Sequence, residues 1–286
     1  MNFSLEYIAQ EIKKNYKSKR WWRNRVIIPY VFGSMTRIHP NYPGYENAVH
    51  VMEEDWDNMI VLDACRADFF EKVVDVSRFD EYRTAVSLGS HSSEWTRRNF
   101  QNDKFGDTVY VSANPHTTLE AENSFHKIIE LWDSNFDHDA GTVTPDVVRD
   151  RAIDCYEEYP NKKFIIHFMQ PHGPFIGSDL GNELDSDKEY WQAYEQNLRY
   201  VFQYAEDIID VIPGKTVITA DHGLAHSSGI KNWLGLTGHK SRLRLPSMVE
   251  VPWAVTDDQR RDILEGEVSK AGGDNIQERL KDLGYL

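Results

Sequence analysis

The sequence contains few cysteines and no long apolar run. Only Cys65 and Cys155 occur among its 286 residues, so no disulfide framework supports the fold. No stretch reaches the roughly 18 to 20 apolar residues of a membrane span. The first residues, 1–14, form an amphipathic pattern without the apolar segment of a signal peptide. Together these absences predict a reduced, cytoplasmic location.

Positive charge is also scarce, with 32 Lys and Arg residues against 46 Asp and Glu and a net charge of -14. Phosphate backbones need basic surface, so we expect no nucleic acid as the main partner. The hydrophobic share of 40% and the charged share of 27% are those of a folded globular protein. The length suits one large α/β domain as well as two small ones.

The N-terminal region is the exception to the acidic composition. Residues 17–25 are basic and contain Trp21 and Trp22, and an apolar run, Val26 to Phe32, follows them. Residues 17–32 could touch an anionic membrane surface, or their aromatic side chains could pack on the core with the arginines facing water. We expect residues 1–50 to form a helical, basic extension beside a catalytic domain of residues 51–286.

Short apolar segments alternate with longer amphipathic ones between residues 57 and 255. Strands are predicted at 59–62, 108–112, 164–168, 217–219 and 248–251, and helices at 66–74, 93–100, 146–158 and 187–212. Fully apolar strands interleaved with helices of this length indicate a mainly parallel sheet covered on both faces, an α/β fold. The tail, 257–286, is predicted to form two polar helices.

Acidic and imidazole side chains follow two of these strands. Asp221 and His222 come after 217–219, and Asp63 ends the strand at 59–62. Open α/β sheets carry their sites at the carboxyl ends of strands, where these groups could hold a metal ion. Asp63 could instead cap the following helix. Arg66 and Asp68 could serve the site or pair with each other.

A serine-rich turn precedes the helix predicted at 93–100. The positive potential of a helix N-terminus favours a deprotonated hydroxyl and binds an ester's anionic oxygens. The alternative is a plain serine N-cap. Two metal-binding carboxylates, one imidazole and such a serine form a coherent set for ester cleavage.

Three histidines complete the candidates. His172 lies between Pro171 and Pro174, which stiffen the backbone around it, and His239 follows Gly238. We expect both to act on the ester. His167 lies among apolar residues within a predicted strand and is interpreted as a core histidine.

This ordered set resembles the alkaline phosphatase and sulfatase superfamily, in particular short archaeal sulfatase-like proteins and more distantly lipoteichoic acid synthases. The resemblance is carried by VLDACRAD (61–68), GSHSSEW (89–95), QPHGPF (170–175), TADHG (219–223) and GH (238–239). It covers residues 57 to 255 and implies a three-layer α/β/α sandwich.

The resemblance also implies roles for individual residues. Ser92 takes the nucleophile position, two residues before the Glu-Trp pair, and His172 and His239 are the other catalytic candidates. The implied metal ligands are Asp63, Ser92, Asp221 and His222. The implied substrate-binding residues are Arg66, His172, His239 and Lys240.

Two departures from the superfamily narrow the expected chemistry. Residues 92–96 lack the C/S-x-P/A-x-R signature that sulfatases convert to formylglycine, which favours a phosphate ester over a sulfate ester. The loop with Gln170 and His172 offers no acid for a second metal, so one divalent ion is expected, with a second still open. Mixed Asp and His ligands favour manganese or zinc over calcium.

We therefore expect a metal-dependent hydrolase acting on a small-molecule, glycan or lipid ester. Transfer of a phosphoglycerol-type group to a glycan or lipid is one alternative. A catalytically inactive relative that binds an anionic glycan is the other.

Overall fold

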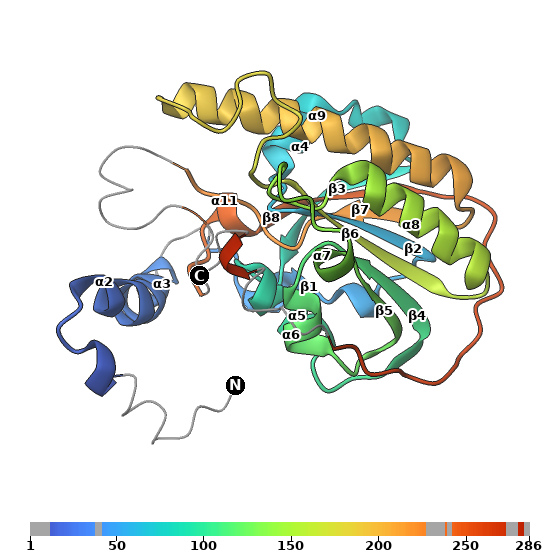
Figure 1. Ribbon diagram of the computed structural model, residues 1–286, viewed down its shortest axis with the longest axis horizontal. Helices are drawn as coiled ribbons and strands as arrows, with labels where there is room; N and C mark the ends of the chain where they lie inside the picture. The colour runs from blue at the N-terminus through green and yellow to red at the C-terminus, as the bar shows by residue number, and fades with distance from the viewer. Residues whose placement is uncertain (1–11, 38–41, 227–237, 239–241, 273–279, 283–286) are drawn as a thin grey trace.

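The computed structural model describes residues 12–37, 42–226, 238, 242–272 and 280–282. Its centre is an eight-stranded sheet in the order β1-β3-β8-β7-β2-β6-β4-β5 (Figure 1). The strands are β1 (Ala48–Val49), β2 (Asn58–Asp63), β3 (Glu81–Ser87), β4 (Phe105–Ser112), β5 (Phe125–Glu130), β6 (Lys163–Pro171), β7 (Thr216–Thr219) and β8 (Glu250–Thr256). Strand β8 runs antiparallel to β3 and β7, and the other neighbouring pairs are parallel.

Helices cover both faces of the sheet. They are α2 (Lys19–Trp22), α3 (Gly33–Thr36), α4 (Ala67–Val73), α5 (Ser92–Phe100), α6 (His116–Ala121), α7 (Leu131–Ser134), α8 (Pro145–Glu158), α9 (Asp187–Val211) and α11 (Pro246–Val249). Helices α4, α8 and α9 lie on one side of the sheet, and α5 and α6 lie on the other (Figure 1). This arrangement confirms the predicted three-layer fold with a mainly parallel sheet.

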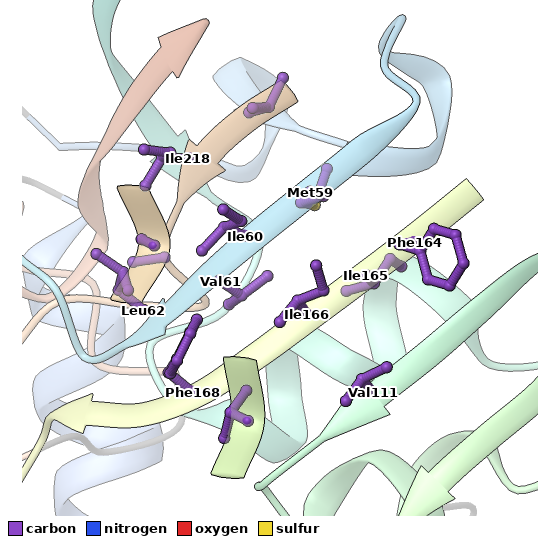
Figure 2. Packing of buried hydrophobic residues seen from close by; sticks show 14 of the residues in the cluster. Met59, Ile60, Val61, Leu62, Val111, Phe164, Ile165, Ile166, Phe168 and Ile218 are labelled. Carbon is purple, nitrogen blue, oxygen red and sulfur yellow. The ribbon is translucent and has the colours of Figure 1, made fainter. Parts of the chain in front are cut away.

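The central strands are buried on both faces, which explains their continuous apolar sequence. Every residue of β2 is buried, and β2 pairs with β6 on one side and β7 on the other. Figure 2 shows the apolar side chains of β2 and β6, among them Ile60, Leu62 and Ile166, packed together in this core. Burying one such side chain contributes about 1.5–3 kcal/mol. This packing holds the carboxyl ends of the three strands side by side.

The strand predicted at 248–251 begins two residues later in the structure, at Glu250. Met248 and Val249 belong to α11, and β8 starts at Glu250. Pro246 at the start of α11 supplies the backbone angle of a first helical turn, so the apolar pair there is helical.

The predicted C-terminal helices are wrong for residues 257–272, which contain no helix. This stretch, here called the C-terminal strap, runs past the amino ends of the strands, where Arg261 donates to the carbonyls of Asp57 and Lys162. The backbone N–H of Leu264 donates to Asn161, and that of Ser269 to Phe125. These N–H groups of the strap are therefore bonded to the sheet and its loops and not within a helix.

Short helices lie within residues 19–36 of the N-terminal region. A π-helical segment, Arg23–Phe32, joins α2 to α3. Within the described ranges, no helix is both long and apolar enough to cross a bilayer. The cytoplasmic location and the boundary near residue 50 stay predictions.

Candidate active site and metal centre

Two buried carboxylates lie abreast at the carboxyl edge of the sheet because of strand register. Val61 of β2 pairs with Thr219 of β7, and an aspartate follows each of these residues by two positions. Asp63 and Asp221 are both fully buried. Adjacent buried negative charges are costly unless cations or hydrogen bonds compensate them.

Backbone amides hold one oxygen of Asp221. Its Oδ1 accepts from the N–H of Ala64 at 3.0 Å and of His222 at 2.8 Å. Ala64 has a φ of 59°, a left-handed conformation that costs a residue with a Cβ about 1–2 kcal/mol. That strained turn aims the Ala64 N–H at the carboxylate. No described group donates a hydrogen bond to the other oxygen, Oδ2.

His222 presents a lone pair to both carboxylates. Its Nδ1 lies 2.7 Å from the carbonyl oxygen of Gly223, so Nδ1 carries the proton in the neutral ring and donates it there. The Nε2 atom then lies 3.4 Å from Oδ2 of Asp221 and 3.8 Å from Oδ1 of Asp63. A backbone carbonyl on the far nitrogen is the usual support of a metal-binding histidine.

His167 joins the same cluster, although its sequence context indicated a core histidine. It is buried on β6 opposite Val61, with Nε2 3.9 Å from Oδ2 of Asp221 and 4.0 Å from Oδ2 of Asp63. Its Nδ1 lies 2.9 Å from the hydroxyl of Tyr110. Asp63, His167 and Asp221 form a group that could bind a metal ion.

The protonation states fit a cation. Burial lowers the pKa of His167 to about 4, so its ring is neutral and able to ligate at neutral pH. Burial alone would raise the pKa of Asp221, but the neighbouring His222 and His167 and the Ala64 N–H lower it. Metal–ligand bonds of about 2.0–2.2 Å place neighbouring ligand atoms about 3–4 Å apart, the spacing found here. The Nε2 atoms of His167 and His222 lie 3.9 and 3.4 Å from Oδ2 of Asp221, which accepts no hydrogen bond from the described residues.

Ser92 is the serine that faces this cluster. Its Oγ lies 3.2 Å from Nε2 of His222. The hydroxyl of Ser90 bonds to Glu94, and that of Ser93 bonds to Glu120. The predicted alternative of a serine N-cap is wrong, because the cap of α5 is His91, whose Nδ1 accepts from the N–H of Ser93 at 3.1 Å.

A close approach of backbones fixes the turn before Ser92. A Cβ on Gly89 would lie 2.5 Å from the Cβ of Trp95 and 2.6 Å from its backbone N. Only glycine leaves room for the turn to pass directly beside the first turns of α5. This contact sets where α5 begins and therefore where the Ser92 hydroxyl lies.

His172 lies next to the cluster through its backbone. Its N–H donates to the carbonyl of Asp63 at 3.2 Å, and its Nδ1 donates to the carbonyl of Gly173 at 2.7 Å. Burial lowers the pKa of His172. The side-chain amide of Gln170 points elsewhere, toward Thr142 and the carbonyl of Val143.

Arg66 is held by its neighbours. It makes a bidentate ion pair with Asp68 and donates to the carbonyl of Leu224. Of the two predicted alternatives, a role at the site or a pair between Arg66 and Asp68, the structure has the pair. Its guanidinium lies 5.2 Å from the ring centre of Phe69 and 5.0 Å from that of Trp191. His239 and Lys240 lie outside the described residues.

Three polar residues that sequence reasoning missed also lie at the cluster. Asn114 donates from Nδ2 to Oδ2 of Asp63 at 2.7 Å. The rings of His91 and His116 are 5.0 Å apart, and His91 lies 6.2 Å from His222. Burial lowers the pKa of His116 to about 3. Asn114 and His116 follow the predicted strand at 108–112, the same strand-end signal that identified Asp63.

No family model and no curated protein matches the sequence, but solved structures match the fold. The phosphoethanolamine transferase EptA of Neisseria meningitidis, an integral membrane protein, aligns over 71% of this chain and 47% of its own, with 12% identity and a TM-score of 0.54. An alkaline phosphatase superfamily protein of Vibrio parahaemolyticus aligns over 77% and 64%, with 12% identity and a TM-score of 0.44. The lipoteichoic acid synthase LtaP of Listeria monocytogenes aligns over 73% and 66%, with 13% identity and a TM-score of 0.44.

The match to EptA agrees with the fold class predicted from the sequence. The described chain has the α/β/α architecture found in EptA, and it spans about half of that protein's length. At this identity the similarity extends to the fold alone. The chemistry must be argued from the residues at the sheet edge.

Proposed function

We propose that this chain is a metal-dependent enzyme that cleaves a phosphate ester with Ser92 as the nucleophile. The observation that carries the proposal is the position of the Ser92 hydroxyl, 3.2 Å from Nε2 of His222 and beside two buried carboxylates. Phosphate is preferred over sulfate because residues 92–96 lack the formylglycine signature.

One divalent cation would be held by Asp63, Asp221, His222 and the hydroxyl of Ser92. His167 would be a further ligand, because its Nε2 lies within 4.0 Å of both carboxylates. Two carboxylates with imidazole nitrogens favour zinc or manganese over calcium, which prefers an all-oxygen shell. When bound, the cation supplies positive charge that stabilises a deprotonated hydroxyl and the oxygens of the phosphoryl group.

The chain's own groups then account for the remaining steps. The Ser92 hydroxyl first loses its proton to water, and its oxygen then forms a bond to phosphorus while the bond from phosphorus to the leaving oxygen breaks. The leaving oxygen takes a proton from His172, whose Nδ1 contact with Gly173 fixes the ring. Burial lowers the pKa of His172, so its ring takes up a proton less readily than an exposed histidine, and the protonated form that donates is the stronger acid.

The phosphoseryl group formed on Ser92 passes to water in a hydrolase or to an acceptor hydroxyl in a transferase. An added alcohol distinguishes the two outcomes, because a transferase yields a new phosphate ester of that alcohol. The proposed substrate is the ester of a small molecule, glycan or lipid.

The test compares Ser92→Ala with Ser93→Ala, a matched control whose hydroxyl bonds to Glu120. Chromogenic phosphate monoesters, phosphate diesters and sulfate esters are assayed with zinc or manganese, and metal binding is measured by calorimetry. We expect Ser92→Ala to lose turnover while it still binds metal, and Ser93→Ala to remain active. Full turnover by a metal-loaded Ser92→Ala protein would refute the assignment.

A further inference from the structure

Residues 12–37 carry a concentration of positive charge that the rest of the chain lacks. They contain eight Lys and Arg residues and no Asp or Glu, within a chain whose net charge is -14. We call these residues the basic segment. Such a segment is attracted to a negatively charged surface and falls within the range of polybasic lipid-binding regions.

The basic segment also exposes apolar and aromatic side chains. Tyr16 is 59% exposed, Tyr30 is 55% and Val31 is 49%, and the half-buried rings of Trp21 and Trp22 meet edge to face. Aromatic rings with one polar edge are the side chains that settle at the boundary between lipid and water. Nucleic acid would use the positive charge but would leave exposed aliphatic groups such as Val31 without a partner.

The opposite side of the basic segment is attached to the catalytic core. Ile28 is fully buried in a cluster with Leu243, Met248 and Val249. Gly33 lies so close to the carbonyl of Arg242 that a Cβ there would be 2.6 Å from its oxygen. The segment is therefore docked on the loop that follows the candidate histidine His239 in sequence. Figure 1 shows α2 and α3 on the same side of the molecule as α11.

This loop is joined to the turn that carries the nucleophile. The N–H of Arg242 donates to Oε2 of Glu94 at 3.2 Å, and the same oxygen accepts from the N–H and hydroxyl of Ser90. The guanidinium of Arg242 lies 4.7 Å from the ring centre of Tyr30. One buried carboxylate thus links the base of the basic segment to the residues just before Ser92.

We propose that the basic segment binds an anionic lipid bilayer and thereby holds the carboxyl edge of the sheet, with Ser92, at the membrane surface. Charge complementarity and the exposed aromatic and aliphatic side chains select this occupant. A further consequence, which rests on the proposed function, is that the phosphate ester belongs to a molecule in or on that bilayer.

Co-sedimentation of the full chain with vesicles tests the binding directly. One set of vesicles is pure phosphatidylcholine, and the other is an equal mixture of phosphatidylcholine and phosphatidylglycerol. We expect binding to the mixed vesicles only, weakening as salt is added. Absence of binding to the mixed vesicles, or binding to a DNA duplex in their place, would overturn the proposal.

Charge-removing variants locate the surface. Each basic residue near an anionic membrane contributes about fivefold to partitioning, so replacing Lys13, Lys14, Lys17 and Lys19 with Gln is expected to weaken binding by more than about a hundredfold. The control replaces the exposed lysines Lys104, Lys127 and Lys270 with Gln and is expected to bind normally. Equal loss in both variants would show a net-charge effect and would overturn the assignment to the basic segment. Circular dichroism checks that each variant is folded.

The Ser92→Ala protein separates this inference from the proposed function. It is expected to bind mixed vesicles as well as the unchanged chain does. If the chain cleaves soluble esters but ignores vesicles, the inference fails and the proposed function stands. If vesicle binding holds and no ester is cleaved, the proposed function fails instead.

Discussion

The side-chain amide of Asn114 donates a 2.7 Å hydrogen bond to Oδ2 of Asp63. Its own orientation is fixed, because Oδ1 of Asn114 accepts from the N–H of His116 at 2.9 Å. One oxygen of Asp63 therefore accepts from a neutral donor. This hydrogen bond fixes the orientation of the Asp63 carboxylate plane relative to His222 and Asp221.

Replacing Asn114 with Ala should weaken metal binding without abolishing it. Partners that orient ligands typically contribute about 10- to 100-fold to metal affinity, and we expect a loss in that range for zinc or manganese by calorimetry. The matched control is Asn123→Ala, whose exposed amide bonds to Glu122 outside the site. Unchanged affinity in Asn114→Ala would show that Asp63 does not ligate the ion.

Replacing His167 with Phe distinguishes a ligand from a space-filling core histidine. Phe fills a similar volume without a nitrogen, so a purely structural role predicts unchanged metal binding. We expect most metal affinity and all turnover to be lost in a folded protein. Tyr110→Phe, which removes only the group beside Nδ1, should lose about tenfold or less in affinity. Equal metal affinity in His167→Phe and the unchanged chain would show that His167 has a structural role in the core and is not a ligand.

Removal of metal by a chelator should lower thermal stability as well as activity. Asp63 and Asp221 are both buried, so their charges repel each other when no cation is present. A metal present at about 100 times its dissociation constant contributes about 2.7 kcal/mol to the folded state. We expect the melting temperature to fall on chelation and to recover when zinc or manganese is added back. A melting temperature insensitive to chelation would contradict a metal bound by these carboxylates.

Replacing Glu94 with Gln should disturb the turn before Ser92. The buried Glu94 carboxylate accepts from the hydroxyl of Tyr45 at 2.6 Å as well as from Ser90 and the N–H of Arg242. Gln puts a donor where one acceptor stood, which we expect to cost about 1–3 kcal/mol in urea unfolding and to lower kcat. The control Glu122→Gln changes a carboxylate that is 46% exposed and should do neither. Metal affinity should be retained, since the contacts of the Glu94 carboxylate are with Tyr45, Ser90 and Arg242 and not with the carboxylate pair.

Asp55 gives a dependence of stability on pH at the far end of the sheet. The hydrogen bond from Arg260, with a smaller contribution from Lys215, lowers the pKa of Asp55 below its ordinary 3.8. A carboxyl with a lowered folded pKa adds stability above its unfolded pKa and loses it as the pH falls through the folded value. Asp55→Asn should therefore be less stable than the unchanged chain at neutral pH, by a small amount because Asp55 is exposed. Urea unfolding should show the difference vanishing in acid; a constant difference would contradict the assignment.

The sequence allowed the central sheet to be predicted because its strands are buried on both faces. Strands β2, β6 and β7 are short apolar runs, and the aspartates that follow β2 and β7 stand out against them. Strand β3 was missed because it carries Glu81 and Arg83 and exposes much of its length. Its partner on one side is the two-residue β1, so polar residues are tolerated there.

The site was predicted in part, and the omissions have a physical cause. Strand-end position identified Asp63 and Asp221, but His167 lies four residues before the end of β6. Its ring reaches the carboxylates because β6 pairs with β2, and the register of that pairing cannot be predicted from a single sequence. The resemblance had selected Ser92 among three neighbouring serines, and in the structure the hydroxyls of the other two bond to Glu94 and Glu120.

The C-terminal strap has a consequence for the order in which the protein is completed. When residue 256 has been synthesised, all eight strands exist, yet Asp57, Asn161 and Phe125 still lack the groups that the strap supplies. These partners come from three distant parts of the chain, and they are brought together only once the sheet has formed. We therefore expect the strap to dock late in folding, at the edge opposite the one that carries Asp63 and Asp221. A chain that ended at residue 256 would contain every strand of the described sheet and lack the strap's hydrogen bonds at the amino ends of those strands.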